Sequence, residues 1–272
     1  MKWIVGVAGI LLVTSAASFW WLMMSGSDAA DTAPRLFPID EWREELSGDD
    51  LSLRPTEIRL IEVGSDVAPG FAAQAGMFGV DWKTTYGGFQ IRTSAGSIFV
   101  DGGIDAETSK LMTRSAETVT FDVGEYEELL NALENAEHIL LTHEHIDHVM
   151  AIARHPHPSE IAGKLRLNAP QKAALGRFSK SGVLPAELEA VTPFLNGLPQ
   201  YLAPGVLVIP SAGHTPGTQV VFVTLQDGRE YLLIGDIVWA MSNIAQLKTR
   251  PRLTQLVVFD PNENRDAIRL QV

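Results

Sequence analysis

The sequence predicts an α/β fold, because short apolar strands alternate with segments of helical periodicity. Leucines at helical spacing over 124–136 lead into the apolar run 138–141, which reads as a buried strand. Two β-hairpins are expected, one over 86–100 and one over 219–234, each with a Gly-containing turn. The strands at 138–141, 205–209 and 231–234 each run into histidines or an aspartate, which is typical of a catalytic α/β domain.

Length and composition divide the chain into three expected regions. With 272 residues and 46% hydrophobic content, one large domain plus an N-terminal appendage is expected. Residues 1–27 are interpreted as a membrane anchor or signal segment and residues 28–56 as a linker with a surface helix around 39–46. Residues 57–272 are interpreted as the catalytic domain. The net charge of −12 disfavours a nucleic-acid substrate, and the lack of cysteine excludes thiolate ligands and disulfides.

The N-terminal segment is apolar enough to cross a membrane. Residues 3–24 carry no charge, and about 20 such residues span the roughly 30 Å hydrocarbon layer. The run exceeds the roughly 7–15 residues of a cleaved signal core, which favours an uncleaved anchor, although Ser15-Ala16-Ala17 keeps cleavage open. Lys2 before the segment predicts an exported body, anchored in the inner membrane with a periplasmic or extracellular domain, or soluble in the periplasm if cleaved.

The stretch Thr142-His143-Glu144-His145-Ile146-Asp147-His148 follows the strand at 138–141. Residues two apart on an extended chain share a side, so His143 and His145 can hold one ion while Glu144 points away. A turn beyond them lets Asp147 and His148 reach a second position. Imidazole and carboxylate ligands suit zinc-like metals.

This stretch resembles the His-x-His-x-Asp-His signature of the metallo-β-lactamase fold superfamily. The Gly-His-Thr-Pro-Gly element around His214 and the Gly-Asp pair ending in Asp236 match the same superfamily. The resemblance implies a four-layer αββα sandwich of two similar halves with metals at one edge, and it places Asp101 below the metals.

The resemblance also implies a ligand set for two zinc ions. The first ion would take His143, His145 and His214, and the second would take Asp147 and His148, with Asp236 bridging. The superfamily usually supplies a further histidine, yet none follows His214 here, and the expected helix over 261–272 ends without a cap. A missing last strand and an incomplete second site are therefore expected.

The implied chemistry is attack on a carbonyl by a metal-bound hydroxide, with Asp147 orienting it or moving a proton. An ester or lactone is the expected small-molecule substrate, and aromatic residues such as Phe78 and Trp82, together with Phe71 and Met77, would line a pocket for an acyl chain. The alternatives are a non-catalytic remnant that binds one ion or none, and a β-lactam-hydrolysing enzyme. Asp236 and the lack of cysteine count against the β-lactamase, and the oligomeric state stays open.

Two further segments allow more than one interpretation. Residues 64–83 hold large apolar side chains among glycines, so they form either a mobile flap over the site or a segment packed at the domain edge. His155 and His157 alternate like ligands, but Pro156 and Pro158 favour an exposed loop. His138 is interpreted as a strand-start residue rather than as a ligand.

Overall fold

The computed structural model describes residues 2–25, 37–112, 120–179, 183–194, 197–254 and 268. These fall into two compact units. The sandwich unit comprises residues 37–67 and 83–236, and the terminal unit comprises the described parts of residues 1–36, 68–82 and 237–272.

The sandwich unit contains two β-sheets. The first has the order β4-β1-β2-β3-β5. Its strands are β1 (Glu57–Pro69), β2 (Asp81–Arg92), β3 (Ser97–Val100), β4 (Thr120–Phe121) and β5 (His138–Leu140). Strands β2 and β3 form the first expected hairpin, and β5 runs parallel to β3 with Phe99 opposite Ile139. The parallel pairing requires the crossover through helix α5 (Val123–Asn135), as the sequence pattern indicates.

The second sheet is antiparallel, in the order β6-β7-β8-β9. Its strands are β6 (Gln200–Ala203), β7 (Val206–Pro210), β8 (Gln219–Thr224) and β9 (Glu230–Leu233). Alternate side chains of β7 and β8 meet side chains of β2, β3 and β5 in one apolar cluster, which therefore forms the core shared by the two sheets. The buried members of this cluster are Ile91, Ile98, Val100, Leu140, Val206, Val208, Val221, Val223 and Leu225.

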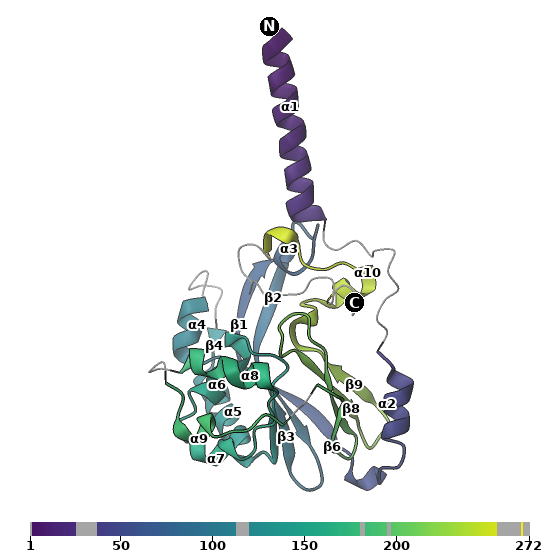
Figure 1. Cartoon of the computed structure of the whole chain (residues 1–272), viewed down its shortest axis with the longest axis vertical. Helices are drawn as coiled ribbons and strands as arrows, with labels where there is room; N and C mark the ends of the chain where they lie inside the picture. The colour runs from purple at the N-terminus through teal and green to yellow at the C-terminus, as the bar shows by residue number, and fades with distance from the viewer. Residues whose placement is uncertain are drawn as a thin grey trace. The chain divides into compact units, whose positions relative to one another are not determined.

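Helices cover the outer face of each sheet. The helices that pack against the first sheet are α4 (Ala106–Met112), α5 (Val123–Asn135), α6 (Ile146–Ala153), α7 (Pro158–Ala162), α8 (Ala169–Leu175) and α9 (Ala186–Glu189). Short 3₁₀ turns occur at Leu51–Leu53, Gly176–Phe178 and Gly235–Ile237. On the other side, α2 (Ile39–Glu45) lies beside the second sheet (Figure 1). The Trp42 ring of this helix lies 5.6 Å from the Phe222 ring of β8. The αββα architecture expected from the sequence is confirmed.

Side-chain caps explain where the main helices begin. The Asp122 carboxylate accepts a hydrogen bond from the Glu125 backbone N–H at the start of α5. Asn168 and Gln171 form a reciprocal capping box at the start of α8. Helix α5 lies within a residue of the expected range 124–136.

The terminal unit is mostly helical. It contains α1 (Lys2–Phe19), the π-helix η1 (Trp20–Met24), α3 (Gly70–Ala73) and α10 (Met241–Gln246). The window Val7–Met24 has a mean hydropathy of 1.8 and is 6% buried, so this helix is long and apolar enough to cross a membrane. The expected helix over 261–272 lies outside the described residues, apart from Ile268.

Residues 64–83, which were expected to form either a flap or an edge element, are divided between strands β1 and β2 and a segment of the terminal unit. Strand β1 continues to Pro69, and the residues after it pack within the terminal unit. The Phe78 ring stacks on Phe19 of α1 at 5.9 Å, and Phe71 lies 5.7 Å from Phe78. The pattern did not reveal this partner because the contact joins residues about 60 positions apart.

Candidate metal centre

The histidine-rich stretch follows β5 and runs directly into helix α6. His143 lies three residues beyond the end of β5, and His145 has an extended backbone and directly precedes α6, which begins at Ile146. Asp147 and His148 therefore lie in the first helical turn, which is the turn expected beyond His145. The segment between β5 and α6 thus carries His143 and His145, and the start of α6 carries Asp147 and His148.

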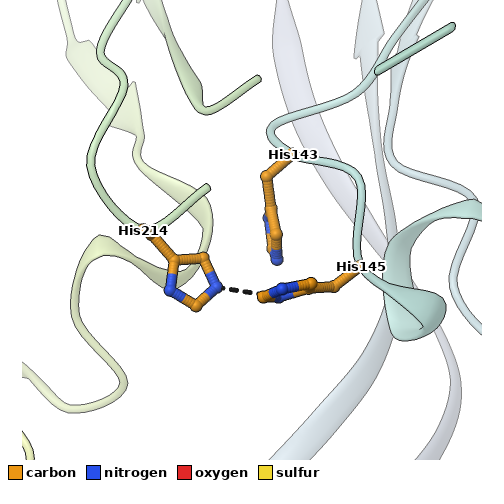
Figure 2. Close-up of side chains that lie close together, drawn as sticks. All are labelled: His143, His145 and His214. Atoms are coloured by element: carbon orange, nitrogen blue, oxygen red, sulfur yellow. Dashed lines mark hydrogen bonds between the residues drawn. The ribbon is translucent and has the colours of Figure 1, made fainter. Parts of the chain in front are cut away.

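His214 reaches the same place from the loop between β7 and β8. Its Nε2 lies 3.0 Å from Nδ1 of His145, and its ring centre lies 4.6 Å from that of His143. Figure 2 shows the three rings converging from two separate segments of the chain. His143 and His214 are fully buried and His145 is half-buried, so the rings meet at the wall of the unit rather than in open solvent.

The donor set fits a zinc-like ion. One ligand atom from each of His143, His145 and His214 lies within 4.8 Å of the others. Two nitrogens bound at about 2.0–2.1 Å to one tetrahedral ion lie roughly 3.3 Å apart, close to the separation of the His145 and His214 nitrogens. Three imidazoles without thiolates are also the donors of many catalytic zinc sites.

A second group of possible ligands adjoins the first. His143, Asp147 and His148 also offer ligand atoms within 4.8 Å of one another. Asp236 faces both groups, with Oδ1 at 3.5 Å from His148 Nε2 and Oδ2 at 3.9 Å from His214 Nε2. All six expected ligands are thus brought together, and their binding of metal stays a prediction.

Asp101 holds the second group in place from below. Its Oδ2 lies 3.0 Å from Nδ1 of His148, and it accepts hydrogen bonds from the backbone N–H and the hydroxyl of Thr142. In the neutral ring, a proton on His148 Nδ1 donates to this carboxylate, and Nε2, which faces Asp147 and Asp236, can then bind a metal. Asp101 adopts a left-handed backbone (φ 70°), a strain that this hydrogen bonding offsets.

The carboxylates shift the ionisation of the site. Burial, reinforced by the nearby charge of Asp236, raises the pKa of Asp147 to about 6. For His148, burial opposes the charged form, but the Asp101 and Asp147 carboxylates outweigh it and raise the pKa of the imidazole well above its usual range. A cluster this rich in negative charge favours a bound cation.

Glu144 points away from the rings, as expected, and it ties the two histidine loops together. Its carboxylate accepts hydrogen bonds from the Thr215 hydroxyl at 2.7 Å and from the Gly217 backbone N–H at 2.9 Å. The side chain is only 4% exposed. Gln171 adds a second link, because its amide donates to both the Leu141 and Gly217 carbonyls.

Two glycines allow the site to close this tightly. A Cβ on Gly217 would lie 2.4 Å from Glu144 Oε2, so only glycine lets the carboxylate reach the loop. Gly235, with φ of +53°, precedes Asp236, and a Cβ there would lie 2.6 Å from the Thr142 hydroxyl. These supporting roles were not predicted, because Glu144 and Thr142, which each glycine accommodates, are distant from it in the sequence.

The remaining histidines are placed elsewhere. His155 was expected in an exposed loop, but it is buried, with 5% of its surface accessible. Its Nδ1 accepts a hydrogen bond from the His157 backbone N–H. Burial lowers the pKa of His155, so its ring favours the neutral form. His157 is exposed and pairs with Glu134, while His138 begins β5 as expected. None of the three belongs to the ligand groups found among the described residues.

The chain therefore combines an αββα sandwich with two adjoining groups of possible metal ligands at the ends of its strands. The sequence profile of the metallo-β-lactamase superfamily matches residues 90–269. The chain belongs to the metallo-β-lactamase superfamily, and its resemblance to that superfamily is confirmed. No curated protein sequence matches the chain.

Solved structures of similar fold include lactone hydrolases. An N-acyl homoserine lactone hydrolase with N-hexanoyl-L-homoserine bound at its metal centre matches with a TM-score of 0.56 at 14% identity, covering 80% of this chain and 87% of that one. A probable metal-dependent hydrolase from Staphylococcus aureus matches at 0.54 and 14% identity, covering 80% and 82%. The B. thuringiensis protein AiiA with N-decanoyl-L-homoserine bound matches at 0.51 and 16% identity, covering 75% and 86%. At these identities the likeness shows the fold alone.

Proposed function

We propose that the protein is an exported, membrane-tethered, zinc-dependent hydrolase that opens an ester or lactone of a small molecule. The observation that carries the proposal is the convergence of His143, His145 and His214, whose ligand atoms lie within 4.8 Å of one another. Two structural neighbours hold an N-acyl-L-homoserine, which supports an acylated lactone as the first substrate class to test.

The residues of the chain divide the work in this proposal. His143, His145 and His214 would hold the first ion, and Asp147 and His148 would hold a second, with Asp236 facing both. A bound metal supplies Lewis acidity for the substrate carbonyl and lowers the pKa of its water toward neutrality. Asp147 can accept a proton at its carboxylate and return it to the leaving alkoxide. Asp101 fixes the ring of His148 so that Nε2 faces the reaction site.

The tether is proposed from the terminal unit. The helix from Lys2 has the length and apolar composition of a span, and its described side chains from Val7 to Trp20 are exposed rather than packed. An apolar helix with this exposure is costly in water and stable in a bilayer. We expect the full-length protein to fractionate with membranes and to resist extraction with alkaline carbonate.

The activity is tested with a panel of N-acyl homoserine lactones and aryl esters, using full-length protein in detergent or liposomes. Ring opening releases a carboxylic acid, so pH-stat titration measures turnover directly. We expect turnover that a chelator abolishes and that added zinc restores. His145→Ala should remove it, whereas His157→Ala, an exposed histidine outside the site, should retain it.

Chelator-resistant turnover, or equal turnover in the wild type and the His145→Ala variant, would contradict the assigned site. Zinc bound at the site without turnover on any ester or lactone would favour the non-catalytic alternative.

A further inference from the structure

The base of helix α1 is packed against a second segment of the terminal unit. Phe78 stacks on Phe19 with an interplanar angle of 22°, and Phe71 packs on Phe78. The Gly76 backbone N–H donates to the carbonyl of Met23 at 3.1 Å. Residues 70–80 are therefore attached at the level of the last turn of the apolar helix.

That attachment fixes the depth of the segment if α1 spans a bilayer. About 20 residues cross the hydrocarbon, so a span that starts near Lys2 ends near Trp20 and Trp21, where aromatic residues gather at the interface. Phe78, stacked on Phe19, then lies at the same depth. Its side chain is 43% exposed and that of Val80 is 50% exposed, which is costly in water but favourable in an interface.

Helix α10 is hydrogen-bonded to this segment and carries further exposed apolar side chains. The side-chain amide of Asn243 in α10 donates a hydrogen bond to the Ala73 carbonyl, and that of Gln74 donates to the Gln246 side chain. These hydrogen bonds join α10 to residues 70–80. Met241, Ile244 and Leu247 are exposed on it. Leu247 holds a left-handed backbone (φ 52°), a position that glycine usually takes at a helix end, so the chain accepts strain to display a leucine there.

One cationic side chain lies beside the helix base, and a second follows α10. The guanidinium of Arg252 lies 5.1 Å above the Trp21 ring, and its Nε donates to the Ser25 hydroxyl. Lys248 is exposed next to Leu247. Cations at the level of an interfacial tryptophan are suited to lipid phosphates, because a surface charge there is attracted to the headgroup layer.

We propose that Phe78, Val80, Ile244 and Leu247, here called the collar, insert into the boundary between headgroups and acyl chains. The collar gives the protein a second, interfacial contact with the bilayer beside the helix. This inference rests on the proposed membrane tether. The occupant is a lipid surface, because the collar is continuous with an apolar helix through the Phe19–Phe78 stack and is accompanied by Lys248 and Arg252.

The chain contains no cysteine, so single introduced cysteines can be labelled without background. Val80→Cys and Ile244→Cys report on the collar from two separate segments, and neither residue takes part in the aromatic stack. Leu12→Cys reports on the span, and Val123→Cys, 60% exposed on α5 of the sandwich unit, is the matched control. Each full-length variant is labelled with the environment-sensitive dye NBD and reconstituted into phosphatidylcholine–phosphatidylglycerol vesicles, with or without brominated acyl chains.

We expect labels at positions 12, 80 and 244 to lose roughly half or more of their fluorescence in brominated vesicles, because their dyes contact acyl chains. The label at position 123 should be unaffected. Quenching at position 12 with none at 80 and 244 would overturn the collar while leaving the tether intact. Absence of quenching at position 12 as well would overturn the tether, and the collar with it.

Discussion

At the residue scale, Gly235 sets how closely Asp236 approaches the other ligands. In Gly235→Ala a Cβ would lie 2.6 Å from the Thr142 hydroxyl and 3.3 Å from His143 Nδ1, and the positive φ adds strain. We expect destabilisation of about 1–3 kcal/mol and weaker zinc binding, because Thr142 must leave Asp101. Chemical denaturation and zinc titration measure the two effects. Gly163→Ala, where an added Cβ meets nothing within 4 Å, should change neither.

The six expected ligands could be predicted because each carries its own signal next to a strand end. The supporting residues could not, because Thr142, Glu144 and Gly235 act through partners distant in sequence. The same limit applies to His155, whose burial depends on packing that flanking prolines do not reveal.

At the scale of elements, Glu144 joins the loop that carries His143 and His145 to the loop that carries His214. Glu144→Ala leaves the Thr215 hydroxyl and the Gly217 N–H without this buried acceptor, which costs about 1–3 kcal/mol for each group. We expect lower stability in urea and a loss of zinc affinity, since the histidines would no longer be held together before metal arrives. Glu160→Ala, an exposed carboxylate on α7, is the control. Unchanged zinc affinity in Glu144→Ala would show that the loops are positioned without the carboxylate.

Helix α2 closes the outer face of the second sheet. Trp42 is 5% exposed and packs on Phe222, so Trp42→Ala should destabilise the sandwich unit by about 3–5 kcal/mol. Glu41→Ala on the exposed side of α2 should change stability little. Denaturation followed by circular dichroism compares the two, and an equal effect would mean that α2 does not seal the sheet.

Asp105, directly before α4, accepts a hydrogen bond from Arg154 at the end of α6, and this contact predicts a pH dependence of stability. Burial opposes ionisation of Asp105, but hydrogen bonds from Thr108 and Arg154 outweigh it and lower the pKa of the carboxyl. A lowered folded pKa contributes stability above the unfolded value of about 3.9, and the contribution is lost as pH falls through the folded pKa. Asp105→Asn should therefore destabilise the protein at pH 7 and differ less from wild type near pH 3. A pH-independent difference in unfolding midpoints would contradict this assignment.

The hairpins, α5 and β5 could be predicted because their patterns are local. The position of residues 70–80 could not be predicted, because their local sequence does not indicate which distant aromatic ring they contact. Phe78 stacks on Phe19, a pairing that only the folded chain reveals.

At the scale of the whole molecule, the central claim is that the sandwich unit binds zinc through residues from both of its sheets. The direct measurement is zinc titration of chelator-stripped, full-length protein, with bound metal determined by elemental analysis. We predict one tight step for the three-histidine group, followed by a weaker step for Asp147, His148 and Asp236. His145→Ala should lose the tight step and His157→Ala should keep it. A wild-type protein that retains no zinc, or a His145→Ala variant that binds it with unchanged affinity, would contradict the account.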